Sequence, residues 1–339
     1  MSQFRILIAG CGGMANTWVE YAMQRPDVEI VGLIDINEDN AKILSNKHGL
    51  TVPFFKDVKE AAISTEANLV FDITIPDVHK KITLSAFEAK CDVMGEKPMA
   101  SSLQEAYEMK AAAEAANRFY AVMQNRRYLN NIRALRDSIH KGTIGKSGFV
   151  CADFFIGAHF GGFRDAMKSP LILDMAIHTF DQARFITGAD PVSVYCYEFN
   201  PTGSWYEGNA AAICIFEMSD GSVFNYRGSW CAEGASTSWE AAWRVTGTKG
   251  TAIWDGDHVP YCEVVKLADE HVFQNEHTRV EATVTEMTHE GHFGCLDEMF
   301  LALLEGRKSE TDCTDNIKSM KMVFGALESA DKGQKISLT

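Results

Sequence analysis

Short apolar runs alternate with amphipathic stretches along the first 125 residues of the chain. The apolar runs predict buried strands, and the amphipathic stretches, each roughly ten to fifteen residues long, predict helices. The predicted strands are residues 6–9, 30–35, 69–74, 92–95 and 119–124, and the predicted helices are residues 14–24, 38–48, 79–89 and 102–117. This alternation indicates βαβ units, and therefore an α/β domain with a doubly wound parallel sheet of the Rossmann type.

The pattern changes after about residue 147, where strand-type runs follow one another directly. These runs are residues 148–155, 192–199, 210–216, 222–226, 243–246 and 251–254, with helices predicted over residues 171–187, 290–304 and 315–329. Strands that follow strands predict a large, mostly antiparallel sheet with one open face. We therefore expect an α/β domain over residues 1–125 and an α+β domain over residues 126–339, whose closing helices could pack back on the first domain.

Composition narrows the possible partners and the compartment. The 339 residues carry a formal net charge of −14, which disfavours binding to nucleic acid or to an anionic membrane surface. No apolar run approaches the roughly 18 residues that would span a bilayer, and the N-terminus lacks the pattern of an export signal. The nine cysteines contain no C-x-x-C pair, so we expect the protein to reside in a reducing cytoplasm and to have no metal site.

A glycine-rich segment lies between the first predicted strand and the first predicted helix. Residues 10–15 read Gly-Cys-Gly-Gly-Met-Ala and fit the pattern G-x-G-x-x-A. The first glycine permits a tight turn, the second lets the backbone approach a pyrophosphate, and Ala15 lets helix and strand pack closely. An ordinary glycine-rich turn is the alternative, but the strand–turn–helix context favours a dinucleotide site.

An acidic residue, Asp35, ends the next predicted strand, 20 residues beyond Ala15. A carboxylate at this position accepts hydrogen bonds from both ribose hydroxyls and repels a 2′-phosphate. No arginine follows closely to bind such a phosphate. The sequence therefore predicts NAD as the cofactor and makes NADP less favoured.

Two further segments carry candidate chemistry. Lys97, in Glu96-Lys97-Pro98, follows a predicted strand, where a lysine can stabilise a developing alkoxide. Asp174, His178 and Asp181 have the spacing i, i+4 and i+7, which would place them on one helical face. A carboxylate one turn from a histidine can orient the ring for proton transfer. Taken singly, both segments could also be exposed ion pairs.

Together and in this order, the segments resemble the Gfo/Idh/MocA oxidoreductases, the group of glucose–fructose oxidoreductase and inositol dehydrogenase. The resemblance spans essentially the whole chain. It rests on the glycine segment at residues 10–15, on Ile-Thr-Ile-Pro-Asp-Val-His at residues 73–79, on Glu96-Lys97-Pro98 and on the Asp174–His178–Asp181 pattern, with softer matches at residues 125–128 and 142–145.

The resemblance implies a role for each matching residue. Lys97, Asp174 and His178 would be catalytic, with His178 exchanging the proton of the reacting hydroxyl. The residues implied to bind the cofactor are Gly10, Gly12, Gly13, Met14, Ala15, Asp35, Ile36, Thr74, Pro76, His79, Glu96, Lys97 and Asn125. Those implied to bind the substrate are Lys97, Arg127, Tyr128, Arg164, Asp174 and His178. The resemblance also implies a cis Lys97–Pro98 bond and a homodimer or homotetramer whose open sheets pair face to face.

The resulting hypothesis is an NAD-dependent dehydrogenase acting on a secondary alcohol of a sugar, cyclitol or sugar derivative. Two alternatives within the same family remain: a glycosidase that uses bound NAD for a transient oxidation, and a non-catalytic NAD-binding regulator. Tryptophans such as Trp230, Trp239 and Trp243 could stack on a sugar ring or lie in the core. The spacing of His289, His292 and Cys295 could hold a metal, but no fourth ligand is evident.

Overall fold

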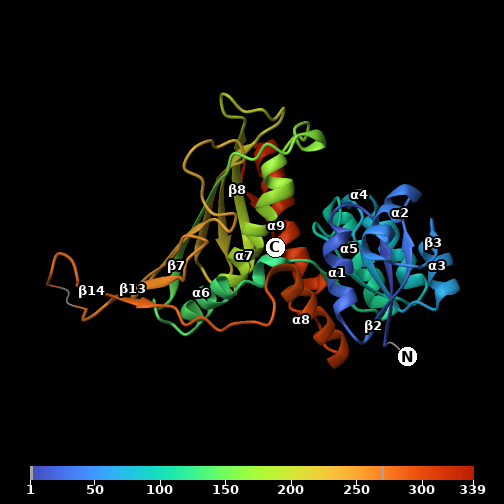
Figure 1. Ribbon diagram of the computed structural model, residues 1–339. Helices are drawn as coiled ribbons and strands as arrows, with labels where there is room; N and C mark the ends of the chain where they lie inside the picture. Colours follow the sequence, from blue (N-terminus) through green and yellow to red (C-terminus); the bar gives the residue numbers. More distant parts are fainter. Residues whose placement is uncertain (1–2, 269–270) are drawn as a thin grey trace. The chain divides into compact units, whose positions relative to one another are not determined.

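The computed structural model describes residues 3–268 and 271–339, and its contacts divide the chain into two compact units. The first unit comprises Met1–Asn125 and His292–Ile317, and the second comprises Arg126–Gly291 and Lys318–Thr339. Figure 1 shows the elements of both units. The chain crosses between the units three times, and the third crossing falls within helix α9 (Cys313–Lys332).

The first unit contains a six-stranded sheet in the order β3-β2-β1-β4-β5-β6, with every pair parallel. Its strands are β1 (Phe4–Ala9), β2 (Val28–Ile34), β3 (Phe54–Phe55), β4 (Leu69–Asp72), β5 (Asp92–Gly95) and β6 (Tyr120–Val122). The predicted doubly wound parallel sheet is confirmed. The two-residue strand β3 was not predicted, because so short a run carries no periodicity.

Three helices of this unit begin at polar side chains that accept backbone N–H groups. The helices are α1 (Ala15–Gln24), α2 (Glu38–His48), α3 (Val58–Thr65), α4 (Pro76–Glu88), α5 (Leu103–Ala116) and most of α8 (Gly291–Glu305). Asn37, Asp57 and Ser102 cap α2, α3 and α5 respectively. Helix α3 was not predicted from the sequence pattern, although its Asp57 cap is a recognisable start signal.

The strand order of the first unit reverses between β1 and β4, which is where open α/β sheets bind their ligands. At this point the backbone of Gly10 has a φ of +87°, and a Cβ on it would lie 2.5 Å from the carbonyl oxygen of Ile73. Only glycine satisfies both conditions. After the neighbouring strand β5, the Lys97–Pro98 peptide bond is cis, which confirms the prediction.

The second unit contains a nine-stranded sheet in the order β14-β13-β12-β11-β7-β10-β9-β8-β15. Its strands are β7 (Ser147–Phe155), β8 (Pro191–Phe199), β9 (Ala211–Met218), β10 (Val223–Ser229), β11 (Ala242–Gly247), β12 (Gly250–Trp254), β13 (Tyr261–Val265), β14 (His277–Glu281) and β15 (Ile336–Ser337). Neighbours are antiparallel except for β7 and β10, which are parallel. The predicted, mostly antiparallel sheet is therefore confirmed.

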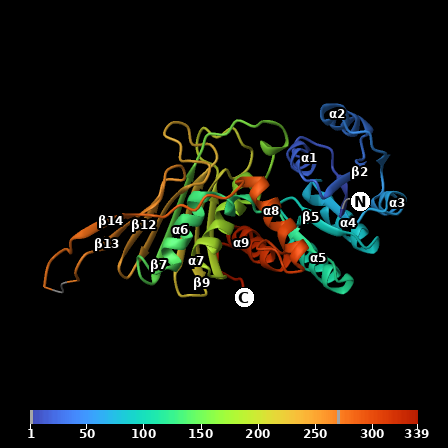
Figure 2. The same ribbon diagram turned by 60° about the horizontal axis from the view of Figure 1, so that its bottom comes forward.

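One face of this sheet is covered by helices and the other is not. The helical segments are α6 (Asn130–His140), α7 (Ile177–Thr187), the π-helix η3 (Leu171–Ala176), the short 3-10 helices η1 (Asn125–Arg127) and η2 (Gly162–Arg164), and part of α9. Helices α6 and α7 lie over one face (Figure 2), where Phe180 of α7 packs edge-on against Phe216 of β9. On the opposite face, Ile213 and Ile215 of the same strand are exposed.

Candidate functional site

The loop between β1 and α1 forms an open cradle at the start of the helix. A Cβ on Gly12 or Gly13 would meet no other atom within 4 Å, so their missing side chains leave free space above the loop. Among the described residues, no side chain caps the N-terminus of α1, and its first turn contains no acidic residue. Because the N-terminus of a helix attracts anions, this cradle fits the pyrophosphate of a dinucleotide.

Asp35 lies directly after β2 and is bonded to the same loop. Its Oδ2 atom accepts a 2.8 Å hydrogen bond from the backbone N–H of Cys11, and its Oδ1 atom accepts a 2.8 Å bond from the N–H of Asn37. The Asn40 amide lies 3.4 Å from Oδ1. These bonds hold the carboxylate beside the glycine loop, where it can accept hydrogen bonds from ribose hydroxyls.

A cavity of about 490 Å³ opens at the same sheet edge. Gly10, Gly12, Asp35, Ile36 and Thr74 are the predicted cofactor residues that line it. Its other lining residues are Ile34, Asn37, Asn40, Lys56, Asp57, Val58, Ile73, Ile75, Val78, Lys81, Ile82 and Ser85. Most of these were missed by the sequence analysis, although residues 78, 81, 82 and 85 have the spacing of a single face of α4.

The remaining predicted cofactor residues are not part of the lining of this cavity. Gly13 and Met14 are exposed on the glycine loop, and Ala15 is buried in the first turn of α1. Pro76 begins α4, as expected of a proline at a helix start. His79 lies one turn further along α4 and pairs with Asp72.

His79 forms a buried ion pair with Asp72, the last residue of β4. The ring atom Nδ1 lies 3.0 Å from Oδ1 of Asp72, and the two side chains are 2% and 1% exposed. The hydroxyl of Thr74 donates a 2.6 Å hydrogen bond to the same oxygen. Burial by itself lowers the pKa of His79, but the charge and hydrogen bond of Asp72, together with the charge of Glu96, outweigh burial and raise it. The pair therefore fixes Thr74 at the cavity, and Asp72 is a site residue that the sequence analysis missed.

Glu96 is a buried carboxylate that connects β5 to two helices. The indole N–H of Trp18 in α1 donates a 2.8 Å hydrogen bond to Oε1, and the backbone N–H of Lys97 donates a 3.1 Å bond to Oε2. His292 of α8 lies 3.9 Å from Oε1, and the amide of Asn125 lies 3.4 Å from the other ring nitrogen of His292. Glu96 thus holds the backbone from which the Lys97 side chain extends.

His292 therefore belongs to the Glu96 network. Among residues 3–268 and 271–339, no cluster of three or more histidine, cysteine or acidic side chains has the arrangement of a metal site.

In the second unit, the predicted helix over residues 171–187 consists of the π-helix η3 followed by α7. A π-helix bonds residue i to i+5, so side chains spaced i and i+4 no longer align as in an α-helix. Asp174, on η3, pairs with Arg164, whose Nε lies 2.6 Å from Oδ2. His178, on α7, is 7% exposed. Short π-helical segments occur frequently at functional sites.

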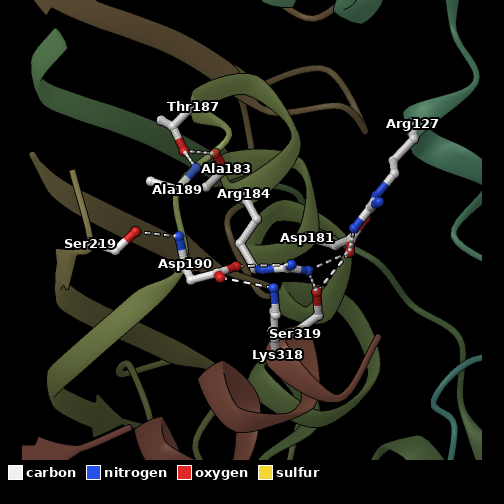
Figure 3. Close-up of polar contacts among 10 residues, drawn as sticks. All are labelled: Arg127, Asp181, Ala183, Arg184, Thr187, Ala189, Asp190, Ser219, Lys318 and Ser319. Atoms are coloured by element: carbon white, nitrogen blue, oxygen red, sulfur yellow. Dashed lines mark hydrogen bonds and ion pairs between the residues drawn. The ribbon is translucent and has the colours of Figure 1, made fainter. Parts of the chain in front are cut away.

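Asp181, which was expected to share a face with Asp174, is buried and has its own partners (Figure 3). Its two carboxylate oxygens accept hydrogen bonds of 2.6 Å each from Nε and Nη2 of Arg127. The hydroxyl of Ser319 in α9 donates a further 2.6 Å bond, and Arg184 bonds to the same hydroxyl at 2.9 Å. This bidentate pair fixes α7 at Asp181, which lies three residues after His178.

The structure therefore places the predicted substrate residues in two environments. Arg164 and Asp174 form one partly exposed pair, with side chains 32% and 19% exposed. Arg127 is directed to Asp181, and Tyr128 is a buried ring under the guanidinium of Arg133, 4.7 Å away.

A parallel sheet with a glycine cradle and an acid at its switch point defines the class of dinucleotide-binding Rossmann proteins. Sequence profiles agree: "Oxidoreductase family, NAD-binding Rossmann fold" matches residues 4–124, and "GFO/IDH/MocA C-terminal domain" matches residues 132–253. The chain belongs to the Gfo/Idh/MocA family of oxidoreductases, whose first domain is an NAD-binding Rossmann fold. The residues of the cradle fit that cofactor.

Individual relatives agree with this assignment. The chain is 26% identical to 1,5-anhydro-D-fructose reductase of Ensifer adhaerens over 73% of its own length and 74% of that protein. It is 26% identical to D-glucoside 3-dehydrogenase of Escherichia coli, with 60% of each chain covered. An oxidoreductase from Agrobacterium radiobacter, solved with NAD+, L-tartaric acid and magnesium, has the same fold with a TM-score of 0.87, 20% identity and coverage of 99% and 98%.

No helix in the part of the chain that the structure describes is long and apolar enough to cross a membrane.

The buried pair makes a prediction about pH. Replacing His79 by Gln leaves the Asp72 carboxylate buried without its counter-charge, which should lower the free energy of unfolding by about 3 kcal/mol near pH 6. The pKa of His79 is raised in the folded state, so its contribution is fully present below the unfolded pKa and is lost as pH rises through the folded pKa. Urea unfolding at about pH 6 and about pH 9 should therefore show a smaller difference at the higher pH.

The control for this experiment is His277→Gln, which changes an exposed histidine on β14. This control should show little difference from the wild type at either pH. A loss for His79→Gln that is equal at both pH values would contradict a charged His79.

Proposed function

We propose that the protein transfers a hydride between NAD and a secondary alcohol or ketone of a sugar, cyclitol or sugar derivative. The observation that carries the proposal is the Arg164–Asp174 pair in the second unit, whose carboxylate lies four residues before His178 in the sequence. A guanidinium beside a carboxylate offers donors and acceptors to neighbouring hydroxyl groups. The reductase and dehydrogenase relatives, which are named for sugar derivatives, support this substrate class.

In this proposal Lys97 and His178 have separate roles in the reaction. The Lys97 ammonium donates a hydrogen bond that stabilises negative charge on the reacting oxygen of the substrate. Neutral His178 accepts the hydroxyl proton during oxidation and returns it during reduction. Asp174 orients the substrate through a second hydroxyl. Bound NAD supplies the acceptor or donor of the hydride.

Two buried acids support these roles without touching the substrate. Glu96 holds the backbone N–H of Lys97, and Asp181 holds α7 through Arg127. We therefore propose Arg127 as a positioning residue for His178.

The nine cysteines are all thiols, which supports a reducing compartment, and we propose the cytoplasm.

The first test is a panel of sugars and cyclitols with NAD or NADP, followed by NADH or NADPH absorbance. We expect reduced cofactor to accumulate with at least one polyol, and faster with NAD because Asp35 repels a 2′-phosphate. Release of sugar from a glycoside without net reduction would instead indicate the glycosidase alternative. If the panel gives neither reduced cofactor nor released sugar, the result would favour a non-catalytic regulator.

The second test concerns the catalytic side chains. His178→Ala and Lys97→Ala should each lower turnover by roughly 10²–10⁴-fold, while NAD affinity measured by calorimetry changes little. Asp174→Ala should mainly raise KM for the substrate. Matched controls are His277→Ala and Lys47→Ala, which alter exposed residues on β14 and α2. Unimpaired turnover of His178→Ala on its true substrate would refute the mechanism.

We also propose a homodimer, or a tetramer built from such dimers, that pairs the uncovered sheet faces. Tyr195 and Tyr197 of β8 lie directly opposite Ile215 and Ile213 of β9, and the four side chains are 40–60% exposed. The aromatic residues of β10, by contrast, are buried under the helices, as Phe224 shows. Contiguous apolar patches of this kind support an interface.

The dimer is tested by light scattering at micromolar concentration. The wild type should have at least twice the monomer mass, and Tyr197→Asp should shift it toward the monomer, because a buried charge opposes association. Ile43→Asp, which alters an exposed apolar residue of α2, is the control and should remain associated. A monomeric wild type would contradict the proposal.

A further inference from the structure

The parallel pairing of β7 and β10 brings two distant loops together in the second unit. Parallel strands end at the same sheet edge, so the loops that follow Phe155 and Ser229 both leave from that edge. A bridge between Gly157 and Cys231 ties the two loops at their start. Residues about 80 positions apart in sequence are thereby placed side by side, as the 6.3 Å separation of the Phe160 and Trp239 ring centroids shows.

Phe160, Phe163 and Trp239 form an aromatic cluster at this edge. Their side chains are 49%, 70% and 44% exposed, whereas Trp230 and Trp243 of the same unit are 2% exposed. Large aromatic side chains gain free energy from burial, so a cluster left this exposed is unusual for a surface without a ligand.

Arg164 connects the aromatic cluster to the proposed catalytic residues. Its guanidinium carbon lies 5.0 Å from the ring centre of Phe160 and 4.8 Å from that of Phe163, while its Nε bonds to Asp174. Two consecutive glycines with positive φ, at +69° and +68°, separate the two phenylalanines in sequence. A Cβ on either glycine would meet no atom within 4 Å, so they serve the backbone turn that brings both rings to the same guanidinium.

Exposure increases from the proposed catalytic residues to the aromatic cluster. His178 is 7% exposed, Asp174 is 19% exposed, Arg164 is 32% exposed, and Phe163 is 70% exposed. A ligand held at Asp174 that extends past Arg164 therefore reaches the aromatic rings on its way to solvent.

We propose that Phe160, Phe163 and Trp239 form a subsite for a second ring, linked to the sugar that is oxidised, so that the substrate is a glycoside or a two-ring sugar. This inference rests on the proposed function and names its substrate class. The Arg164–Asp174 pair has no net charge, so it suits hydroxyl groups better than a phosphate or carboxylate. The aromatic faces add contact with a ring without requiring a charge.

The test compares methyl and phenyl glycosides of the same hexoses, in both anomers, with NAD. In the wild type, kcat/KM should be roughly twofold to tenfold higher for the phenyl glycoside, as expected for one aromatic contact. Phe163→Ala and Trp239→Ala should bring the ratio of the two kcat/KM values close to one. Phe163→Tyr should keep the ratio, as should the control Phe273→Ala, which removes a fully exposed ring between β13 and β14.

The outcomes separate this inference from the proposed function. NADH formation with equal kcat/KM for methyl and phenyl glycosides would overturn the second-ring subsite and leave the proposed function standing. An equal loss of kcat/KM for both glycosides in Phe163→Ala would also overturn the subsite and leave the proposed function standing. A clear preference for a hexose phosphate would assign Arg164 to an anion and also overturn the subsite.

If no glycoside gives NADH, calorimetry is used to measure the affinity of each glycoside for the NAD-saturated protein. Tighter binding of the phenyl glycoside that is lost in Phe163→Ala would support the subsite even though the proposed function had failed. Equal binding, or no binding of either glycoside, would overturn it.

Discussion

The first unit depends on the close approach of two backbones at the ends of β1 and β4. Gly10 passes so near Ile73 that no side chain fits between them, and its positive φ excludes other residues as well. This contact brings the loop after β1 against the loop after β4, so the glycine cradle, Asp35 and Thr74 line one cavity. The candidate NAD site of this family member is therefore a consequence of parallel strand order and one missing Cβ.

Buried carboxylates are the second recurring device. Asp72 pairs with His79, Glu96 accepts from Trp18 and Lys97, and Asp181 accepts a bidentate bond from Arg127. Each of these acids lies beside a residue with a proposed function and bonds to a neighbouring element. Because a buried charge is stable only with its partners in place, each acid fixes the geometry of its surroundings.

Sequence patterns were informative where the signal is local. The glycine segment and the parallel sheet are predicted from the sequence, because strand–turn–helix order is written in neighbouring residues, and the family resemblance implies the cis Lys97–Pro98 bond. The division of residues 171–187 into a π-helix and an α-helix was not predicted, because apolar spacing does not distinguish the two. As a result, Asp174 and Asp181 were expected on one face but have separate partners.

By itself the sequence determined the fold class, the family and the residue types that can carry hydride-transfer chemistry, since these follow from periodicity and short motifs. Only the tertiary structure decided which of those side chains are available. Arg127 and His79 have the chemistry of ligands, yet each forms a buried pair with an acid on another element. The pairing of Phe160 with Trp239 was likewise decided by the parallel register of β7 and β10. The physical reason is that a partner's identity depends on strand order and packing, which no local pattern encodes.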